Sequence, residues 1–383
     1  MNKKRLLILL LLTLTGCQSG DSNLSEIKED IFPDGIKEIE ELPWYFEKEM
    51  TTEFKAENQL DLATNIDDFL NESNFNGVAL IAKEDQIIML NAYGVANVEN
   101  EIPMSVNTQF QIGSVSKPFI AISILQLIER GDLALDQTID EFFPELERGS
   151  EITIHQLLTH SSGLNSGDGL ARYSSFTTPE ELISYAFKNI RYHNEPGFVS
   201  YSNLGYDMLG VIVEKITGQS YETYLQENIL DIAHMTNSGL NTEGIKLENL
   251  ATAYAGHISQ GDEAPVFHPS FGFSSGGMHA TAMDLFRFSQ SLYNDLLLTS
   301  ESYNLMTTPY SQINGSDYGF GWFINARNQE DVISHNGDLL GWHSILIRHQ
   351  ENDFTVILLT NQSGSARNVM MAHYIVEIVT NHN

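Results

Sequence analysis

QIGSVSKPF (residues 111–119) places two serines and a lysine directly before IAISILQLI (120–128), an apolar run that predicts a buried helix. An unpaired ammonium group is costly to bury, so a lysine at the start of a core helix needs a reason. Lys117 is therefore expected to lie at the surface, to be paired, or to be held there for chemistry. The surrounding sequence distinguishes these possibilities.

Ser114 and Lys117 are three residues apart, so their side chains share one face of a helix that begins near Ser114, whereas Ser116 points elsewhere. Pro118 falls in or just past the first turn, where a missing N–H group costs little. The helix therefore begins here. The partial positive charge at its N-terminus favours an oxyanion that forms at Ser114.

A serine hydroxyl becomes a good nucleophile only when a neighbouring base takes its proton, and a lysine can do so if burial lowers its pKa. The spacing alone is not specific, because Ser25 and Lys28 repeat it in an acidic segment without any helical core. Only the copy at 114–117 follows a glycine and opens an apolar helix. This context favours chemistry as the reason for Lys117.

The ends of the chain predict one antiparallel sheet. A helix is expected from Asp61, followed by a hairpin of strands at 77–84 and 86–96. Further strands are expected within 318–361, and a final helix at 366–379. We predict an α/β (α+β) fold in which a sheet of five or more strands is flanked by the N- and C-terminal helices. A mostly helical subdomain is inserted at about 135–300.

The N-terminus predicts export and lipid anchoring. Residues 1–15 have a basic start and an apolar run that is too short to span a bilayer, and the signal ends in LTGC at Cys17. This resembles a bacterial lipoprotein signal of residues 1–16, and it implies a membrane anchor at Cys17 in the cell envelope. An ordinary signal peptide is the alternative. Residues 17–60 are acidic and predict a tether before a catalytic domain at 61–383.

The composition limits the classes of function. The chain has 383 residues, of which 42% are hydrophobic, so it can bury a sizeable core. Its formal net charge of −31 argues against nucleic acid as a partner. A single cysteine excludes an intramolecular disulfide and a thiolate metal cluster, and the histidines form no H-E-x-x-H motif. We therefore expect no metal and no cofactor.

Three motifs in order resemble those of the serine β-lactamase and penicillin-binding-protein superfamily. They are Ser114-x-x-Lys117, Tyr201-Ser202-Asn203, and the sequence ISHNGD at 333–338. The Tyr-x-Asn and His-x-Gly forms resemble the branch of class C β-lactamases, D-alanyl-D-alanine carboxypeptidases, D-aminopeptidases and esterases. Three connecting segments support the resemblance, which runs from about residue 61 to the C-terminus: LLTHSSGL (157–164), GGMHATAMDLFRF (276–288) and YGFGW (318–322).

The resemblance implies a role for each motif residue. Ser114 attacks an acyl carbon, and Lys117 and Tyr201 carry the proton. The remaining residues bind substrate or the oxyanion. Asn203 hydrogen-bonds Lys117 or the substrate amide, His335 orients substrate or assists Tyr201, and backbone N–H groups of Ser114 and of Asp338, which follows Gly337, form the oxyanion hole.

One departure from the superfamily pattern affects the expected substrate. Where β-lactamases and transpeptidases present a lysine to a substrate carboxylate, this chain has His335, and Asp338 adds a negative charge. This moves the expectation from β-lactams toward esters, amides or D-amino acid peptides, peptidoglycan-derived peptides included. Arg348 is a candidate for restoring a positive charge.

Alternatives remain at the level of sequence. Gly272–Gly276 (GFSSG) matches the G-x-S-x-G nucleophile elbow, but the next helix is expected to start at Thr281, too late for Ser274. The leading hypothesis is a lipid-anchored serine hydrolase that forms an acyl-enzyme at Ser114. The alternatives are a non-catalytic penicillin-binding or peptidoglycan-sensing protein of the same fold and a true class C-like β-lactamase.

Overall fold

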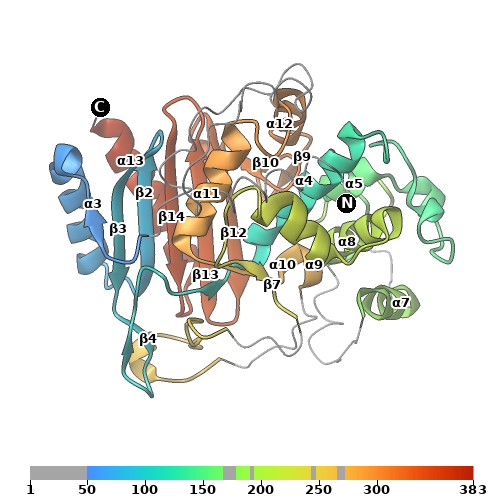
Figure 1. The fold of residues 1–383 in the computed structure, drawn as a ribbon. Helices are drawn as coiled ribbons and strands as arrows, with labels where there is room; N and C mark the ends of the chain where they lie inside the picture. The colour runs from blue at the N-terminus through green and yellow to red at the C-terminus, as the bar shows by residue number, and fades with distance from the viewer. Residues whose placement is uncertain (1–49, 167–177, 190–193, 243–246, 265–271, 383) are drawn as a thin grey trace, which may run out of the picture. The chain divides into compact units, whose positions relative to one another are not determined.

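The computed structural model describes residues 50–166, 178–189, 194–242, 247–264 and 272–382. The expected signal peptide, Cys17 and most of the expected tether lie outside the described residues. Residues 48–383 group into one compact unit. In this unit a large sheet lies between two layers of helices (Figure 1).

Among the described residues the main sheet has nine strands, all antiparallel, in the order β1-β3-β2-β14-β13-β12-β11-β10-β9. The N-terminal hairpin pairs with the last strand, so that Leu80 lies opposite Ile357. The predicted antiparallel sheet built from both ends of the chain is thus confirmed. The strands are β1 (Phe54–Lys55), β2 (Gly77–Lys83), β3 (Gln86–Tyr93), β9 (Ser311–Ile313), β10 (Ser316–Tyr318), β11 (Phe323–Ile324), β12 (Val332–Leu339), β13 (Trp342–His349) and β14 (Phe354–Thr360).

The first and last helices cover one face of this sheet, as predicted. α3 (Leu60–Glu72) buries Leu62, Ile66 and Leu70, whose spacing of about four residues forms one apolar stripe. α13 (Ser365–Asn381) packs beside it, and both helices share one apolar cluster with the strands. Burial of each large aliphatic side chain contributes about 1.5–3 kcal/mol.

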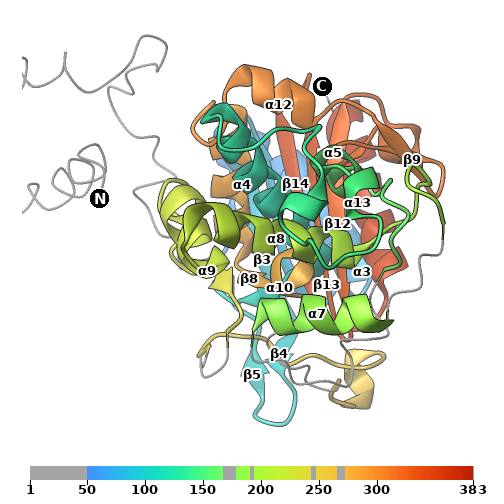
Figure 2. The same ribbon diagram turned by 90° about the vertical axis from the view of Figure 1, so that its right-hand side faces the viewer.

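Helices from the middle of the chain pack mostly on one another (Figure 2), and one of them, α11 (Ala282–Tyr293), covers the opposite face of the sheet. α11 lies inside the range expected for the helical subdomain, yet it contacts the sheet strands β14 and β2. Its N-cap is Thr281, whose side chain accepts a hydrogen bond from the Asp284 N–H. The described helices from the middle of the chain are α4 (Lys117–Glu129), α5 (Ile154–Leu158), α7 (Pro179–Asn189), α8 (Asn203–Thr217), α9 (Tyr221–Leu225), α10 (Phe273–Gly276), α11 (Ala282–Tyr293) and α12 (Ser300–Met306).

Two smaller sheets complete the described fold. β4 (Val95–Asn97) pairs with β5 (Ile102–Pro103), and β8 (Met278–Ala280) lies between β6 (Phe110–Gln111) and β7 (Gly239–Leu240). The second of these sheets fixes the segment that precedes Ser114 against a strand more than 150 residues later in the chain. No helix among the described residues combines the length and the apolar character that crossing a membrane requires.

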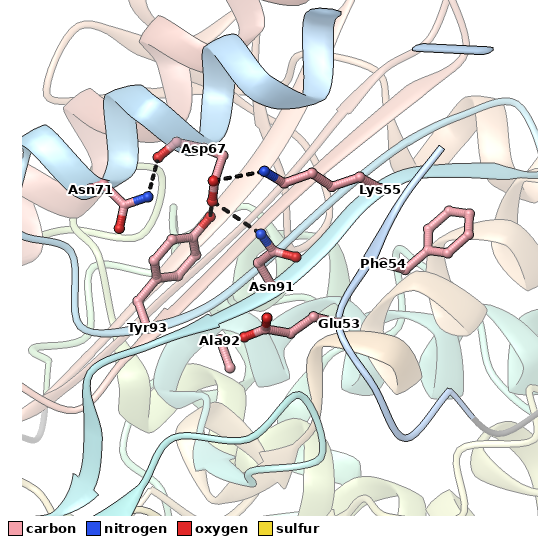
Figure 3. A pocket seen from close by; sticks show the side chains of 8 residues that line it. All are labelled: Glu53, Phe54, Lys55, Asp67, Asn71, Asn91, Ala92 and Tyr93. Atoms are coloured by element: carbon pink, nitrogen blue, oxygen red, sulfur yellow. Dashed lines mark hydrogen bonds and ion pairs between the residues drawn. The ribbon is translucent and has the colours of Figure 1, made fainter. Parts of the chain in front are cut away.

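Part of the segment expected as tether belongs to the folded domain. β1 pairs with β3, and the Lys55 ammonium lies 2.7 Å from the Asp67 carboxylate of α3. Asn91 and Tyr93 of β3 donate to the same carboxylate over 3.0 and 2.6 Å (Figure 3). Lys55 and the donors on β3 hold the pKa of Asp67 below its usual value although its burial acts in the opposite direction. The sequence missed β1 because two residues are too short to show a pattern.

Candidate active site

Ser114 lies directly before helix α4, on the face of the sheet opposite to the one that α3 and α13 cover. The chain forms a 3₁₀ turn, η2 (Gly113–Ser116), which continues directly into α4 at Lys117. The turn still places the two side chains together, with 3.0 Å between Lys117 Nζ and Ser114 Oγ. Ser114 is partly exposed, whereas Lys117 is completely buried. Ser116 is buried and donates to the Gly113 carbonyl oxygen over 2.7 Å, so it does not face the same space.

The Lys117 ammonium group has two further acceptors besides Ser114. Nζ lies 2.6 Å from Asn203 Oδ1 and 2.8 Å from the Ser275 carbonyl oxygen. A protonated amine donates to all three oxygens, and a neutral amine can still donate to the two carbonyl-type oxygens while its lone pair faces the Ser114 hydroxyl. The arrangement therefore accommodates Lys117 before and after it takes a proton from Ser114.

Tyr201 reaches the same place from the segment before α8. Ser202 caps this helix by accepting from the Gly205 N–H, so Tyr201 precedes the cap and Asn203 is the first helical residue. The Lys117 Nζ atom lies 4.8 Å from the centroid of the Tyr201 ring, and the ring is partly exposed. The first two sequence motifs thus meet around one ammonium group.

The third motif lies on the edge of β12 beside Ser114. β11 pairs with β12 only at Ser334 and Ile333, so the described pairing on this edge ends before His335. The Val332 carbonyl faces β11, and because strand residues alternate, the main chain of Asp338 faces the same side. There, a Cβ added to Gly113 would lie 3.0 Å from the Asp338 nitrogen. The main-chain N–H group of Asp338 therefore lies next to the segment that carries Ser114.

Gly337 allows β12 to approach this closely. A Cβ at this position would lie 1.9 Å from the Ile112 carbonyl oxygen and 2.4 Å from Ser344 Oγ. Ser344 donates to the same Ile112 oxygen over 2.6 Å. Because any side chain would separate β12 from the segment that carries Ser114, the glycine sets the width of the site.

The side chain of His335 forms its described hydrogen bonds with its own strand and with Tyr318 of β10. It is buried, with Nδ1 2.8 Å from the Asn336 carbonyl oxygen and Nε2 3.1 Å from the Tyr318 hydroxyl. A carbonyl only accepts, so Nδ1 carries the proton and Nε2 accepts from Tyr318. Burial, together with the charge of Lys117, lowers the pKa of His335 to about 3, so the ring is neutral at pH 7. His335 contacts Tyr318 and its own strand, and its ring centroid is 6.4 Å from that of Tyr201.

A comparison with protein-family models shows to which family the chain belongs. The family model described as "Beta-lactamase" matches residues 62–380, which include all three motifs. The chain belongs to the beta-lactamase family.

Relatives and solved structures resemble the chain over most of its length. The chain is 29% identical to "Putative penicillin-binding protein PbpX" of Bacillus subtilis (strain 168), over 82% of this chain and 78% of that protein. A penicillin-binding protein from Bacillus halodurans matches with a TM-score of 0.72 and 26% identity, covering 81% of this chain and 98% of the other. A D-amino acid amidase from Ochrobactrum anthropi SV3 has the same fold, with a TM-score of 0.74 and 23% identity over 85% of this chain and all of the other.

Charged residues near the β12 edge differ from the lysine-bearing pattern of β-lactamases. The side chain of Asp338 alternates to the face of the sheet that carries Val332 and α13, opposite to that of His335. Its Oδ1 lies 3.1 Å from His343 Nδ1. The carboxylate therefore does not face the space beside Ser114, and its repulsion of an anionic substrate is weaker than the sequence suggested.

Arg348 does not restore a positive charge to the site. It is 3% exposed, pairs with Asp353, and lies with its guanidinium carbon 3.9 Å from the Tyr293 ring centroid. Its position on β13 is opposite Ile333, five residues before Asp338 on β12. The arginine belongs to the packing of α11 on the sheet.

The G-x-S-x-G match is not an elbow in this beta-lactamase-family chain. Ser274 is buried in the short helix α10, where its Oγ donates to the Tyr206 carbonyl oxygen over 2.8 Å. The neighbouring Ser275 N–H donates to Asp207, which holds in place the carbonyl that Lys117 contacts. Sequence reasoning missed this use of α10. Among the described residues no group of three or more metal-ligating side chains comes together.

Proposed function

We propose that this chain is a serine hydrolase that acylates Ser114. The observation that carries the proposal is the position of Lys117 Nζ, which lies 3.0 Å from Ser114 Oγ and is held by two fixed acceptors at 2.6 and 2.8 Å. A pure binding protein has no need of a buried amine in contact with a half-exposed serine. The membership of the chain in the beta-lactamase family supports the same chemistry.

The reaction proceeds in two steps. Ser114 Oγ attacks the acyl carbon and its proton passes to the Lys117 amine, with the Tyr201 phenol beside it as a second proton carrier. The N–H groups of Ser114 and Asp338 stabilise the oxyanion. The leaving amine or alcohol takes the proton as its bond to carbon breaks. Water then attacks the acyl-enzyme, and transfer of its proton in reverse frees the acid and Ser114.

The substrate we propose is an ester, an amide or a D-amino acid peptide. Residues 335–339, which form the described β12 edge, contain neither lysine nor arginine, and His335 is neutral. An acyl donor that needs no carboxylate clamp fits this edge better than a β-lactam does. The fold is shared with a D-amino acid amidase, which supports amides of D-amino acids as the first candidates.

We further propose that the hydrolase works in the cell envelope, attached through a lipid on Cys17. The support for this part is the signal-like sequence of residues 1–16 and the position of Cys17 directly after it. A substrate derived from peptidoglycan would be reached in that compartment.

A turnover screen tests the function. Wild type, Ser114→Ala and the control Ser123→Ala, a buried serine on α4 away from the site, are assayed with p-nitrophenyl esters, D-amino acid amides, D-Ala-D-Ala peptides and nitrocefin. We expect turnover of an ester or D-amino acid amide that Ser114→Ala abolishes and Ser123→Ala retains. Turnover that survives Ser114→Ala contradicts the proposal. A stable penicillin adduct without turnover of any substrate would instead support the sensor alternative.

A further inference from the structure

We infer that His160 is a positioning residue that holds Tyr201 in its working place beside Lys117. His160 comes from the segment LLTHSSGL and touches neither Ser114 nor Lys117 through a described hydrogen bond. The inference rests on the proposed function, because it assigns a task to Tyr201 in the acylation of Ser114. It adds a residue that lies behind the site.

The backbone on both sides of Tyr201 is bonded to His160. The Ser200 N–H donates to the His160 carbonyl oxygen over 2.8 Å, and the Ser202 N–H donates to His160 Nδ1 over 3.0 Å. Tyr201 therefore lies between two hydrogen bonds to one residue. Movement of its backbone would break one of these bonds.

The side chain of Tyr201 is held by the same residue. The rings of His160 and Tyr201 have centroids 4.2 Å apart and an interplanar angle of 31°. The imidazole in turn packs against Tyr206 and Tyr318 at 4.7 and 4.9 Å, so it cannot shift easily. Lys117 Nζ lies over the Tyr201 ring, 4.8 Å from its centroid. The contact between the rings of His160 and Tyr201 thus holds the phenol in place relative to the amine.

The hydrogen bond to Ser202 requires a neutral imidazole with its proton on Nε2. Burial lowers the pKa of His160 well below its usual 6.5, and the charge of Lys117 acts in the same direction. Nδ1 is then free to accept. Nε2 is buried without a hydrogen-bond partner among the described residues, and the backbone of His160 has φ 55° in the left-handed region. Both features cost stability, so packing alone explains this histidine poorly.

A double-mutant cycle separates positioning from mere packing. His160→Phe keeps a ring without the acceptor. His160→Asn keeps an acceptor near Nδ1 and tolerates the left-handed backbone, but it loses the ring contact with Tyr201. Each is combined with wild-type Tyr201 and with Tyr201→Phe. The readouts are the rate constant for labelling of Ser114 by a fluorophosphonate and the melting temperature of each variant.

If His160 acts through Tyr201, we expect His160→Phe to slow labelling by about 10²-fold, since an error of about 1 Å in a catalytic group has effects of that size. His160→Asn should retain more of the rate. Either change should have little further effect in the Tyr201→Phe background. Equal losses in both backgrounds, or an unchanged rate in a folded His160 variant, would overturn the inference. If His160→Phe does not fold, the His160→Asn cycle decides by the same criterion.

Failure of the proposed function has a separate signature. In that case wild-type protein is not labelled, or its labelling survives Ser114→Ala, whatever residue stands at position 160. If labelling requires Ser114 but the effect of a His160 variant is the same with Tyr201 and with Tyr201→Phe, only the inference about His160 is rejected.

Discussion

At the scale of single residues, the hydrogen bonds of Lys117 account for the burial of an amine and fit the role of base that we propose for it. Its three described hydrogen-bond partners are oxygens of a hydroxyl, a side-chain amide and a backbone carbonyl, at 3.0, 2.6 and 2.8 Å. These oxygens satisfy the ammonium hydrogens and carry no full negative charge. The neutral amine is therefore disfavoured less than it would be beside a carboxylate.

Lys117→Met tests this role, because methionine fills similar space without a basic group. We expect the labelling rate of Ser114 by a fluorophosphonate to fall by about 10²–10⁴-fold, the usual contribution of a general base. Lys215→Met, at the exposed end of α8, is the matched control and should label like wild type. A Lys117→Met protein that melts cooperatively and labels at the wild-type rate would exclude the amine as the base.

The sequence could predict Ser114 and Lys117 because their relation is local, three residues on one helical face. Tyr201, Asn203 and the His-x-Gly strand came only from the resemblance to a family, since nothing local places them near Ser114. The partners of His335 could not be predicted. Tyr318 lies 17 residues away on a separate strand, and only folding brings the two side chains to 3.1 Å.

At the scale of elements, the edge of β12 is the feature on which the site depends. The strand ends its pairing with β11 before His335 and then runs beside the 3₁₀ turn that carries Ser114. Contacts of η2 with β12 and β13 keep turn and strand together. The two oxyanion donors that we propose, the N–H groups of Ser114 and Asp338, therefore come from two elements that must stay in register.

Gly337→Ala should disturb that register. Its Cβ would meet the Ile112 carbonyl oxygen at 1.9 Å, so β12 must move away from η2 and the Asp338 N–H with it. Because loss of one oxyanion donor costs about 10²–10³-fold, we expect turnover to fall by about that factor. Gly205→Ala, whose Cβ would meet ordinary contacts from 3.5 Å, is the control. Crystals of Gly337→Ala with an unmoved β12, or unchanged turnover, would contradict this explanation.

Long elements with clear periodicity could be predicted from the sequence, and short ones could not. α3, α13 and the strands β2, β3, β12, β13 and β14 follow their apolar patterns. β1, β6, β7 and β8 have two or three residues each, too few for alternation to show. The 3₁₀ turn at Ser114 was also missed, because its residues are compatible with the first turn of an α-helix.

For the molecule as a whole, buried histidines make stability depend on pH. Burial lowers the pKa of His335 to about 3 and those of His279 and His373 to about 4. The unfolded chain, with histidine pKa values of about 6.5, binds more protons than the native state between these limits. The contribution of these neutral histidines to the stability of the fold is complete above about pH 6.5 and is lost as the pH falls from about 6.5 toward 4.

Urea unfolding at pH 7.5 and 4.5 checks this dependence. We expect the free energy of unfolding to decrease less between the two pH values in His279→Asn than in wild type, since one of the buried histidines is gone. The decrease in wild type should exceed the decrease in His279→Asn by about 1.4 kcal/mol for each unit by which the fold lowers the pKa of His279. His382→Asn, at an exposed position after α13, should behave as wild type. Equal decreases in wild type and His279→Asn would show that His279 is not kept neutral by the fold.

The proposed anchor is a property of the whole chain and can be tested in cells. Cys17→Ala should prevent incorporation of radiolabelled palmitate and shift the protein from the membrane fraction to the soluble fraction. Ser19→Ala, two residues further on, serves as the control and should remain in the membrane fraction. Palmitate labelling that persists in Cys17→Ala, or a wild-type protein that is soluble, would reject the lipid anchor.

The central claim is an acyl-enzyme at Ser114, and peptide mapping by mass spectrometry tests it most directly. Wild-type protein is incubated with a fluorophosphonate, digested, and the modified residue is located by fragmentation. We predict one adduct, on Ser114, with none on Ser116 and none anywhere in Ser114→Ala. An adduct on Ser116 or Ser274, or no adduct on a folded wild-type protein, would contradict the account.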